Sequence, residues 1–474
     1  MLLELARLLV HWRPAFARRM TCVRVVNVLL GLLIASGRRT LTASITARGR
    51  EFEPWAADYL AFSRAPWEVA SLFDAVVDAA VETVDRVCPG GRYLLVAVDD
   101  TGLPKTGKSI ADARWMRDPL SPPFHLNLRW GLRYVHLAMI LPLHTQKMDP
   151  RAISIDFAPA PSIKKPGRKA TDQQRADYKE AQKQKNLSKI MVERVTHLRE
   201  HADASGHRQR LILAMGDGSY TNRNVLGSLP DRVEYLGRTR GDLALFKPAD
   251  PGGRKVYGER LPTPNAVRQD PNHPWTHTEL FYAGEMRKVR FKSASPVLWR
   301  TGGQRRPLRI LVIAPTPYRA ASHARRRWYY RDPAYLLTTD LTTPAEELIQ
   351  AYLARWQIEV EHRDQKSGLG VGHAQVWNGH SVARLHSAHV AMWSMVKLAA
   401  LRTFGMRRTD AYPERPGWYP QEQGDRASQR DIIDVLRADL QLQPIQPTAR
   451  RLPRPKRVPP TRRRLTPGRV AEAA

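Results

Sequence analysis

The sequence contains little cysteine, no long apolar run and too few acidic residues to balance its basic ones. Its two cysteines, Cys22 and Cys88, cannot form a disulfide framework and do not have the spacing of metal ligands. The longest apolar stretch, Val25 to Ser36, falls well short of the roughly 20 residues that a transmembrane helix needs. These absences exclude a small disulfide scaffold and argue against a membrane-spanning or secreted protein, so we expect a cytoplasmic protein.

The charge balance points to a polyanionic partner. The 474 residues include 76 Lys and Arg against 45 Asp and Glu, which gives a formal net charge of +31. A hydrophobic content of 42% and 12 tryptophans distinguish the chain from a disordered polycation and predict a folded protein of several domains. Nucleic acid is the partner that this combination favours, and no membrane partner is expected.

The hydropathy pattern changes along the chain from helical to alternating. Residues 1–90 have apolar residues at helical spacing with interspersed arginines, which is typical either of a DNA-binding module or of a helical bundle with a basic solvated face. Short apolar runs at 93–98, 133–141 and 211–215 predict buried strands. A linker rich in Pro, Lys and Arg and a long helix capped by Thr171 are expected between the last two. This alternation predicts an α/β core.

The second half of the chain is expected to begin with strands and to continue with helices. Residues 231–340 combine short strand-like segments with Pro and Gly loops, which predicts a β-rich insertion. A helix should follow, capped by Thr343 and Glu346 and ending near Lys366, and then more helix to about Phe404. The segment 450–469 holds nine Lys or Arg and five Pro, so we expect a disordered tail that binds phosphates.

The segment from Gly102 to Ser109 fits the nucleotide-binding pattern GxxxxGK[ST]. We do not favour this interpretation, because Asp99 and Asp100 directly before it would repel a nucleotide and the prolines after it prevent a long helix. The alternative is a surface loop in which Lys105 and Lys108 contact DNA phosphates.

A stripe of polar side chains lies along one side of the helix expected before Lys366. At about 100° per residue its members fall on neighbouring positions; they are Tyr352, Arg355, Glu359, His362 and Lys366. The pattern fits a functional site and also fits an ordinary ladder of surface ion pairs. Glu361 is expected on the opposite, solvated side.

Three carboxylates suggest the chemistry. Asp99 and Asp217 each follow a predicted buried strand, and Glu359 lies on the helix. Strand ends of an α/β sheet bring distant residues into one crevice. Three acids gathered there would repel one another unless cations lay between them, and two Mg²⁺ ions are a known solution in phosphodiester chemistry.

On these residues the chain resembles an insertion-sequence transposase of the DDE type, with a ribonuclease-H-like catalytic core. Residues 98–102 (VDDTG) and 214–218 (AMGDG) carry the first two acids. Residues 352–366 match the Y-x2-R-x3-E-x6-K signature of the bacterial cut-and-paste branch at Tyr352, Arg355, Glu359 and Lys366.

The resemblance implies a role for each matching residue. Asp99, Asp217 and Glu359 would be the catalytic residues and the ligands of two Mg²⁺ ions, for which Mn²⁺ can substitute. The family pattern D-x-[ST] selects Asp99 over its neighbour Asp100, which remains the fallback.

The other signature residues would bind DNA. Tyr352, Arg355 and Lys366 fall on positions that hold backbone phosphates in related enzymes, and Trp356 would stack on DNA or pack on the apolar face. Related enzymes also flip a base against an aromatic side chain. Tyr335 and Trp328 are the candidates here.

The expected fold is therefore α/β, with a ribonuclease-H-like core and a β-rich insertion. We expect a helical DNA-binding domain at 1–90, the first part of the core at 91–230, the insertion at 231–340, the core helix and C-terminal helices at 341–405, and a region with a basic tail at 406–474.

The expected function is cleavage at transposon ends, bearing terminal inverted repeats, and strand transfer into target DNA. A homodimer would act in the synaptic complex, in the cytoplasm at the nucleoid. A catalytically inactive or domesticated DNA-binding descendant, another ribonuclease-H-like nuclease and, least favoured, a P-loop NTPase remain alternatives.

Overall fold

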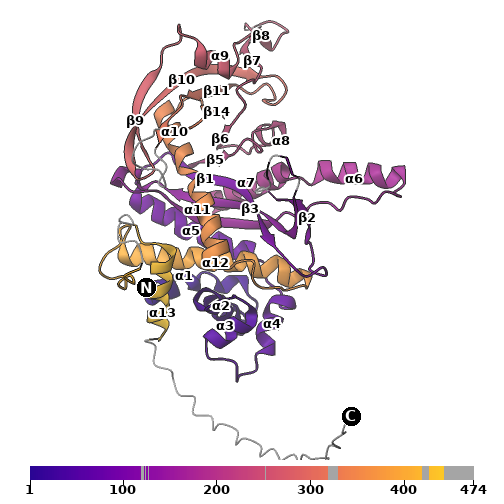
Figure 1. The fold of residues 1–474 in the computed structure, drawn as a ribbon, viewed down its shortest axis with the longest axis vertical. Helices are drawn as coiled ribbons and strands as arrows, with labels where there is room; N and C mark the ends of the chain where they lie inside the picture. Colours follow the sequence, from indigo (N-terminus) through magenta and orange to yellow (C-terminus); the bar gives the residue numbers. More distant parts are fainter. Residues whose placement is uncertain are drawn as a thin grey trace, which may run out of the picture.

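A mixed β-sheet forms the centre of the molecule (Figure 1). The computed structural model describes residues 1–118, 122, 124–125, 127–250, 252–318, 329–418 and 426–441. The sheet begins with the strand order β4-β3-β1-β5-β6. The strands are β1 (Tyr93–Pro104), β3 (Leu128–Leu141), β4 (Arg151–Pro159), β5 (Leu211–Gly216) and β6 (Val233–Arg238). β1 runs antiparallel to β3 and parallel to β5. This mixed α/β architecture is consistent with a ribonuclease-H-like core.

Six further strands extend the same sheet beyond β6, and β2 (Arg114–Arg117) pairs with β3. The order continues β6-β14-β11-β10-β7-β8, and β9 pairs with β10. The strands are β7 (Leu245–Pro248), β8 (Tyr257–Arg260), β9 (Thr276–Tyr282), β10 (Glu285–Trp299), β11 (Leu308–Ile313) and β14 (Ala334–Thr338). Smaller elements are β12 (Pro317–Tyr318), β13 (Tyr329–Tyr330), α8 (Arg223–Leu226) and α9 (Pro264–Gln269). The β-rich segment therefore continues the core sheet through β14, and β6 lies inside the core.

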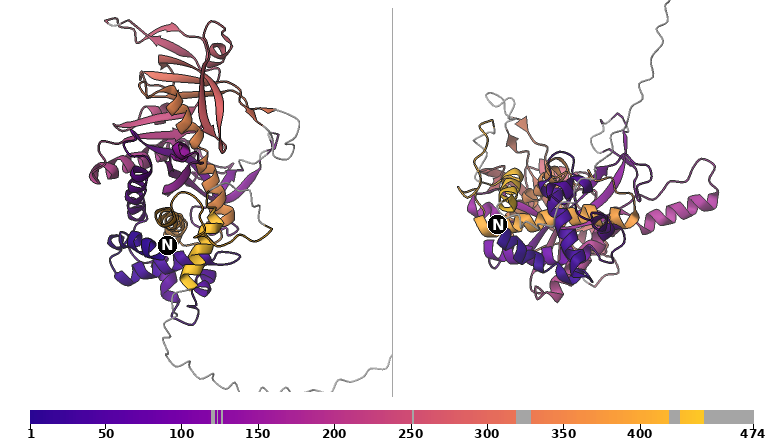
Figure 2. Two further views of the ribbon diagram at one scale, coloured as in Figure 1. Left: turned by 90° about the vertical axis from the view of Figure 1, so that its left-hand side faces the viewer. Right: turned by 90° about the horizontal axis from the view of Figure 1, so that it is seen from below.

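Helices from both ends of the chain lie together below the sheet (Figures 1 and 2). They are α1 (Leu2–Val10), α2 (Arg19–Ile34), α3 (Leu41–Ala47), α4 (Ala56–Ser63), α5 (Ala70–Val87), α12 (Gly379–Phe404) and α13 (Gln429–Gln441), with a 3₁₀ turn at Arg13–Ala15. α12 is buried over most of its length. One apolar core includes residues of α1, α2, α5, α12, β1 and β3. The N-terminal helices are therefore packed onto the sheet domain.

The segment between β3 and β5 differs from the expected linker and single helix. The linker contains a 3₁₀ turn (Leu143–Gln146) and strand β4, whose alternating residues are too small and polar to signal a buried strand. The capping box of Thr171 and Gln174 is confirmed, but the helix is broken into α6 (Asp172–Gln184) and α7 (Leu187–Ala204). Asn186 interrupts it, because its side chain caps α7 at the nitrogen of Lys189. α6 has no buried residue and projects from the body (Figure 2).

The helix that carries Glu359 consists of three pieces, α10 (Ala345–Ala354), α11 (Gln357–Arg363) and a π-helical turn (Asp364–Gly368). The predicted Thr343 cap is wrong: Pro344 occupies the N-cap position, and the Thr343 nitrogen donates instead to Asp340 Oδ1 over 3.0 Å. Within the described ranges no helix is long and apolar enough to cross a membrane. The basic tail at 450–469 lies outside the described residues.

Candidate active site

Asp99 and Asp217 lie at the same level of two neighbouring parallel strands, but the prediction that the first strand ends before Asp99 is wrong: Asp99 lies within β1, which continues to Pro104, and Asp217 directly follows β5. β1 and β5 pair in register at Ala97 and Met215, and each aspartate follows two residues later. Asp217 Oδ1 accepts hydrogen bonds from the backbone nitrogen and hydroxyl of Ser219, over 2.9 and 2.6 Å. The sheet register thus brings together two acids that are far apart in the sequence.

The adjacent Asp99 and Asp100 face different partners. Burial raises the pKa of Asp99 to about 7, and the carboxylates of Asp100 and Asp217 add to the rise, although the Asp100 N–H and Arg355 oppose it. Asp100 instead accepts a hydrogen bond from Arg133 Nε over 2.8 Å. The charges of Arg355 and Asp217 act on Asp99, whereas Asp100 is hydrogen-bonded to Arg133, and this difference in partners favours Asp99 as the first acid.

Glu359 forms an ion pair on its own helix. Arg355 Nη2 donates to Glu359 Oε1 over 3.3 Å. Burial raises the pKa of Glu359, Arg355 lowers it, and Asp217 raises it further, so Glu359 lies within electrostatic range of Asp217. The i,i+4 pair expected from the sequence is present, but it borders an acidic cluster and its arginine is buried.

Arg355 retains unused hydrogen-bond donors. Its Nε and Nη1 atoms are buried and have no hydrogen-bond partner within the described part of the chain. Its guanidinium lies 5.5 Å from the centre of the Tyr352 ring. Buried donors without acceptors are costly, and a guanidinium fork matches the oxygens of a phosphate. This arrangement suits an anion that is bound during function.

A cleft of about 850 Å³ opens beside this helix. Tyr352, Arg355 and Trp356 all line it, together with strands of the β-rich segment. The Trp356 side chain is 56% exposed, so it is available for stacking and is not part of the apolar core. Three of the four predicted DNA-binding residues therefore share one cleft.

Lys366, the fourth, lies on the π-helical turn. Burial lowers its pKa and so does Arg129, whereas the carboxylates of Asp99 and Asp100 raise it. Lys366 therefore approaches the acids but does not line the cleft around Trp356.

The two aromatic candidates for a flipped base have different outcomes. The Tyr335 ring is buried, and its hydroxyl donates to Asn265 Oδ1 over 2.8 Å. It has a structural partner in the β-rich segment and no face open to a base. Trp328 lies outside the described residues. Tyr330, which the sequence did not single out, is 68% exposed and lines the same cleft as Trp356.

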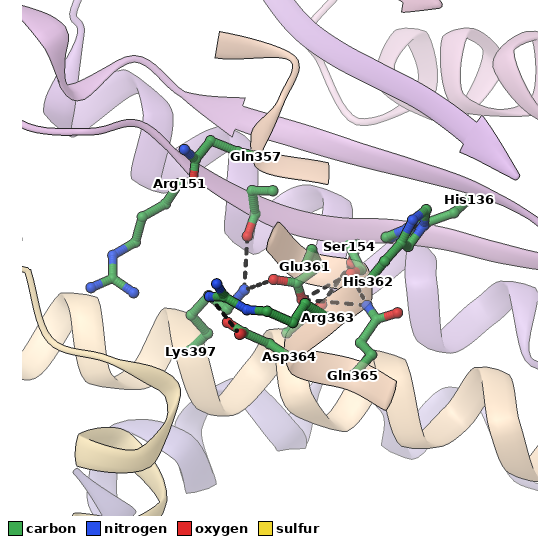
Figure 3. Close-up of polar contacts among 12 residues, drawn as sticks. His136, Arg151, Ser154, Gln357, Glu361, His362, Arg363, Asp364, Gln365 and Lys397 are labelled. Atoms are coloured by element: carbon green, nitrogen blue, oxygen red, sulfur yellow. Dashed lines mark hydrogen bonds and ion pairs between the residues drawn. The ribbon is translucent and has the colours of Figure 1, made fainter. Parts of the chain in front are cut away.

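Glu361 is not solvated as expected. Its side chain is 3% exposed and pairs with Lys397 of α12, which is 5% exposed (Figure 3). Ser154 of β4 donates to Glu361 Oε1 over 3.2 Å, and Gln365 Nε2 donates to Ser154 Oγ over 2.9 Å. Helical spacing alone could not predict this burial, because α12 packs against the side of α11 that was expected to face solvent. The network ties the Glu359 helix to both β4 and α12.

Two histidines lie behind Asp99. His136 is the register partner of Asp99 on β3, and its Nδ1 lies 2.9 Å from His362 Nε2. His362 Nδ1 in turn lies 3.9 Å from Asp99 Oδ2. Burial lowers the pKa of His362 to about 3, so the ring is neutral. His362 belongs to the predicted stripe, whereas only the strand register reveals His136.

The nucleotide-binding interpretation of Gly102–Ser109 is wrong. Gly102 lies within β1, and the next regular element after Lys108 is the strand β2 (Arg114–Arg117), not the helix that a phosphate-binding loop requires. Lys105 is not at the surface: it is 5% exposed and donates to the carbonyls of Gly372 and Ala374, each over 2.8 Å. Lys108 is exposed, as expected for the alternative.

The donor chemistry of the acids suits a hard divalent cation. Asp99 and Asp217 offer carboxylate oxygens, the ligands that Mg²⁺ prefers, and the Asp217 carboxylate contributes to the raised pKa of Asp99. Searching the described ranges finds no group of three or more His, Cys, Asp or Glu side chains arranged to hold a metal. Glu359 is bonded to Arg355 in this conformation, so it does not complete the set.

Comparison with known proteins identifies one family. A family model described as DDE superfamily endonuclease matches residues 13–306, more than half of the chain. The match contains Asp99 and Asp217 but ends before Glu359 and the Y-R-E-K signature. A search of curated proteins found no significant match.

Proposed function

Because the chain belongs to the DDE superfamily endonucleases, we propose that it is a DNA transposase of the Y-R-E-K branch that cuts transposon ends and joins them to target DNA. The observation that carries the proposal is the juxtaposition of Asp99, within β1, and Asp217, directly after the adjacent parallel strand β5, beside a helix on which Glu359 is paired with a buried arginine that has two unused donors. Fold and family alone would support only a nuclease.

In this proposal the carboxylates bind cations and the helix binds DNA. Asp99, Asp217 and Glu359 would hold Mg²⁺, which supplies activation of the attacking water or 3′-hydroxyl and stabilisation of the leaving oxygen. Arg355 would orient the phosphate with its two free donors, and Tyr352 supports its guanidinium. If a DNA phosphate replaced Glu359 as the partner of Arg355, the Glu359 carboxylate would be free to bind a cation.

Other parts of the chain would bind the phosphates of DNA without sequence preference. We assign this to the helices within residues 1–90, to Lys366 and Trp356 at the site, and to the basic tail. Two protomers would bring two inverted-repeat ends together. Because these contacts with phosphates are electrostatic, the affinity for DNA should fall steeply as the salt concentration rises.

The decisive experiment replaces the third acid. Glu359→Gln should bind a transposon-end duplex as the unsubstituted protein does and lose Mg²⁺-dependent nicking, because the amide cannot serve as an anionic ligand. Glu347→Gln, an exposed position on α10, is the matched control and should nick normally. Normal nicking by Glu359→Gln would refute the assignment.

A strand-transfer assay separates the remaining alternatives. Joining of a labelled end to plasmid DNA supports a transposase. Nicking without joining favours another ribonuclease-H-like nuclease, and sequence-specific binding without nicking favours an inactive descendant.

A further inference from the structure

A second cavity, distinct from the Trp356 cleft, lies on the other side of the core sheet's first strands. It has a volume of about 850 Å³. Its walls are the hairpin of β3 and β2 (Arg114–Arg117), the segment after β4, and the facing parts of α6 and α7. We refer to it as the hairpin groove. None of the residues assigned above to cleavage or to DNA binding lines it.

The hairpin groove is strongly basic. Its lining includes six cationic side chains, which are Arg114, Arg117, Arg133, Lys164, Lys165 and Lys185. No aspartate or glutamate is among the described residues that line it. Such one-signed walls attract a polyanion and would be self-repelling without one.

Aromatic rings accompany this charge. Trp115 and Trp130 are directly opposed across β2 and β3, and their ring centres are 5.7 Å apart in an edge-on arrangement. Trp130 is anchored because its Nε1 donates to the Gly107 carbonyl over 2.9 Å. Trp115 is 56% exposed, and Lys108 Nζ lies 4.5 Å from its ring centre. Tyr178 of α6 lines the facing wall.

One residue connects the hairpin groove with the acids. Arg133 lines the groove and also donates to Asp100, the neighbour of Asp99. Because successive side chains of a strand point to opposite faces of the sheet, a DNA strand in the groove would reach β1 one residue from Asp99, on the face opposite the Asp99 side chain.

We propose that the hairpin groove binds unpaired nucleotides of the DNA strand that continues from the cleaved position, an inference that rests on the proposed function. The cations match its phosphates, and Trp115 provides an aromatic surface on which a base stacks. A duplex offers the same phosphates, but its bases are already stacked on one another. An acidic peptide could satisfy the cations but would make little use of the tryptophan pair.

The test compares two DNA probes by fluorescence anisotropy. Labelled oligo(dT) of about 15 nucleotides reports single-strand binding, and a blunt duplex of the same length is the reference. Trp115→Ala should weaken oligo(dT) binding by about tenfold and duplex binding by less than about twofold, because it removes one stacking surface and no charge. Trp115→Phe should restore most of the lost affinity.

Charge is tested separately. The double variant Lys164→Ala/Lys165→Ala should weaken both probes and reduce the slope of log affinity against log salt by about 1.4 for the single strand. Trp418→Ala removes a tryptophan that is 81% exposed and does not line the groove, so it should leave all values unchanged.

Two outcomes overturn the proposal. Oligo(dT) binding by Trp115→Ala at the unsubstituted level would exclude stacking there, and polyglutamate competing as well as oligo(dT) would indicate an acidic protein partner. Mg²⁺-dependent nicking is measured in parallel. If Trp115→Ala loses oligo(dT) affinity but the unsubstituted protein never nicks, the groove assignment stands and only the proposed function is refuted. If the unsubstituted protein nicks but Trp115→Ala binds oligo(dT) normally, only the groove assignment is refuted.

Discussion

Breaking the buried ion pair between Glu361 and Lys397 should cause a large loss in the free energy of unfolding. We consider Lys397→Met, which preserves the length of the side chain and removes its ammonium group. Both side chains are almost fully buried, at 3% and 5% exposure, so the carboxylate would remain in the interior with only Ser154 and Gln365 as hydrogen-bond donors. Removing one partner of a buried pair typically costs about 3–5 kcal/mol.

Protonation limits the part of this cost that comes from the carboxylate. An abandoned carboxylate can bind a proton, and at pH 7 that costs a free glutamic acid about 4 kcal/mol. The Lys397 ammonium also donates to the Ala152 carbonyl over 2.9 Å, so Lys397→Met should lose up to roughly 4 kcal/mol of unfolding free energy from the carboxylate at pH 7, less towards pH 5, and in addition the cost of this lost hydrogen bond at either pH. The double variant Glu361→Gln/Lys397→Met, which contains no charge at either position, should recover most of the loss.

The assay is urea unfolding monitored by circular dichroism at both pH values. Lys247→Met is the control, because Lys247 belongs to an exposed pair with Glu259, and its midpoint should not move. Equal stability of Lys397→Met and the unsubstituted protein, or a double variant no better than the single one, would refute the reasoning.

Three further predictions concern single side chains. Asp99→Asn should abolish nicking, whereas Asp100→Asn should retain it with reduced activity because only the Arg133 contact is lost; the reverse order in a nicking assay would make Asp100 the first acid. Burial lowers the pKa of Lys105 to about 7, below its value in the unfolded chain. The folded state therefore binds fewer protons than the unfolded state, and the free energy of unfolding should rise between about pH 7 and 10. Unfolding curves of Lys105→Met should lack this rise, and a rise of equal size in the variant would assign it to other groups. Arg355→Lys keeps the charge but not the fork, so binding of end DNA should weaken several-fold in an anisotropy titration, and unchanged affinity would contradict phosphate binding by Arg355.

The sequence predicted the strands that carry the acids because those strands are continuous apolar runs. Most residues of Tyr93–Val98 and Leu211–Met215 are buried, although β1 continues past Asp99 to Pro104, which the polar residues after Val98 did not indicate. The sequence also predicted the helix of Tyr352 and Glu359, since helical spacing places signature residues on one side. Their assignment as catalytic and DNA-binding residues remains a proposal.

Tertiary partners account for what the sequence could not predict. Glutamate usually lies at the protein surface, and it is the packing of α12 that buries Glu361 against Lys397. Lys105 follows a strand in an apparent loop, but carbonyls from residues 372 and 374 enclose its ammonium group. His136 acquires its place behind Asp99 through strand register, which depends on both β1 and β3. Each case involves contacts across tens to hundreds of residues.

The continuous core beneath the sheet limits how this protein can change. Trp12 is fully buried and donates to the Leu72 carbonyl over 3.1 Å, and Arg384 of α12 donates to the Phe62 carbonyl over 3.2 Å. Deleting the first 90 residues would strip α12 of its cover and expose an apolar surface that invites aggregation. The N-terminal helices therefore cannot be exchanged as a separate unit, and a new role for them has to evolve by substitutions on their outer face.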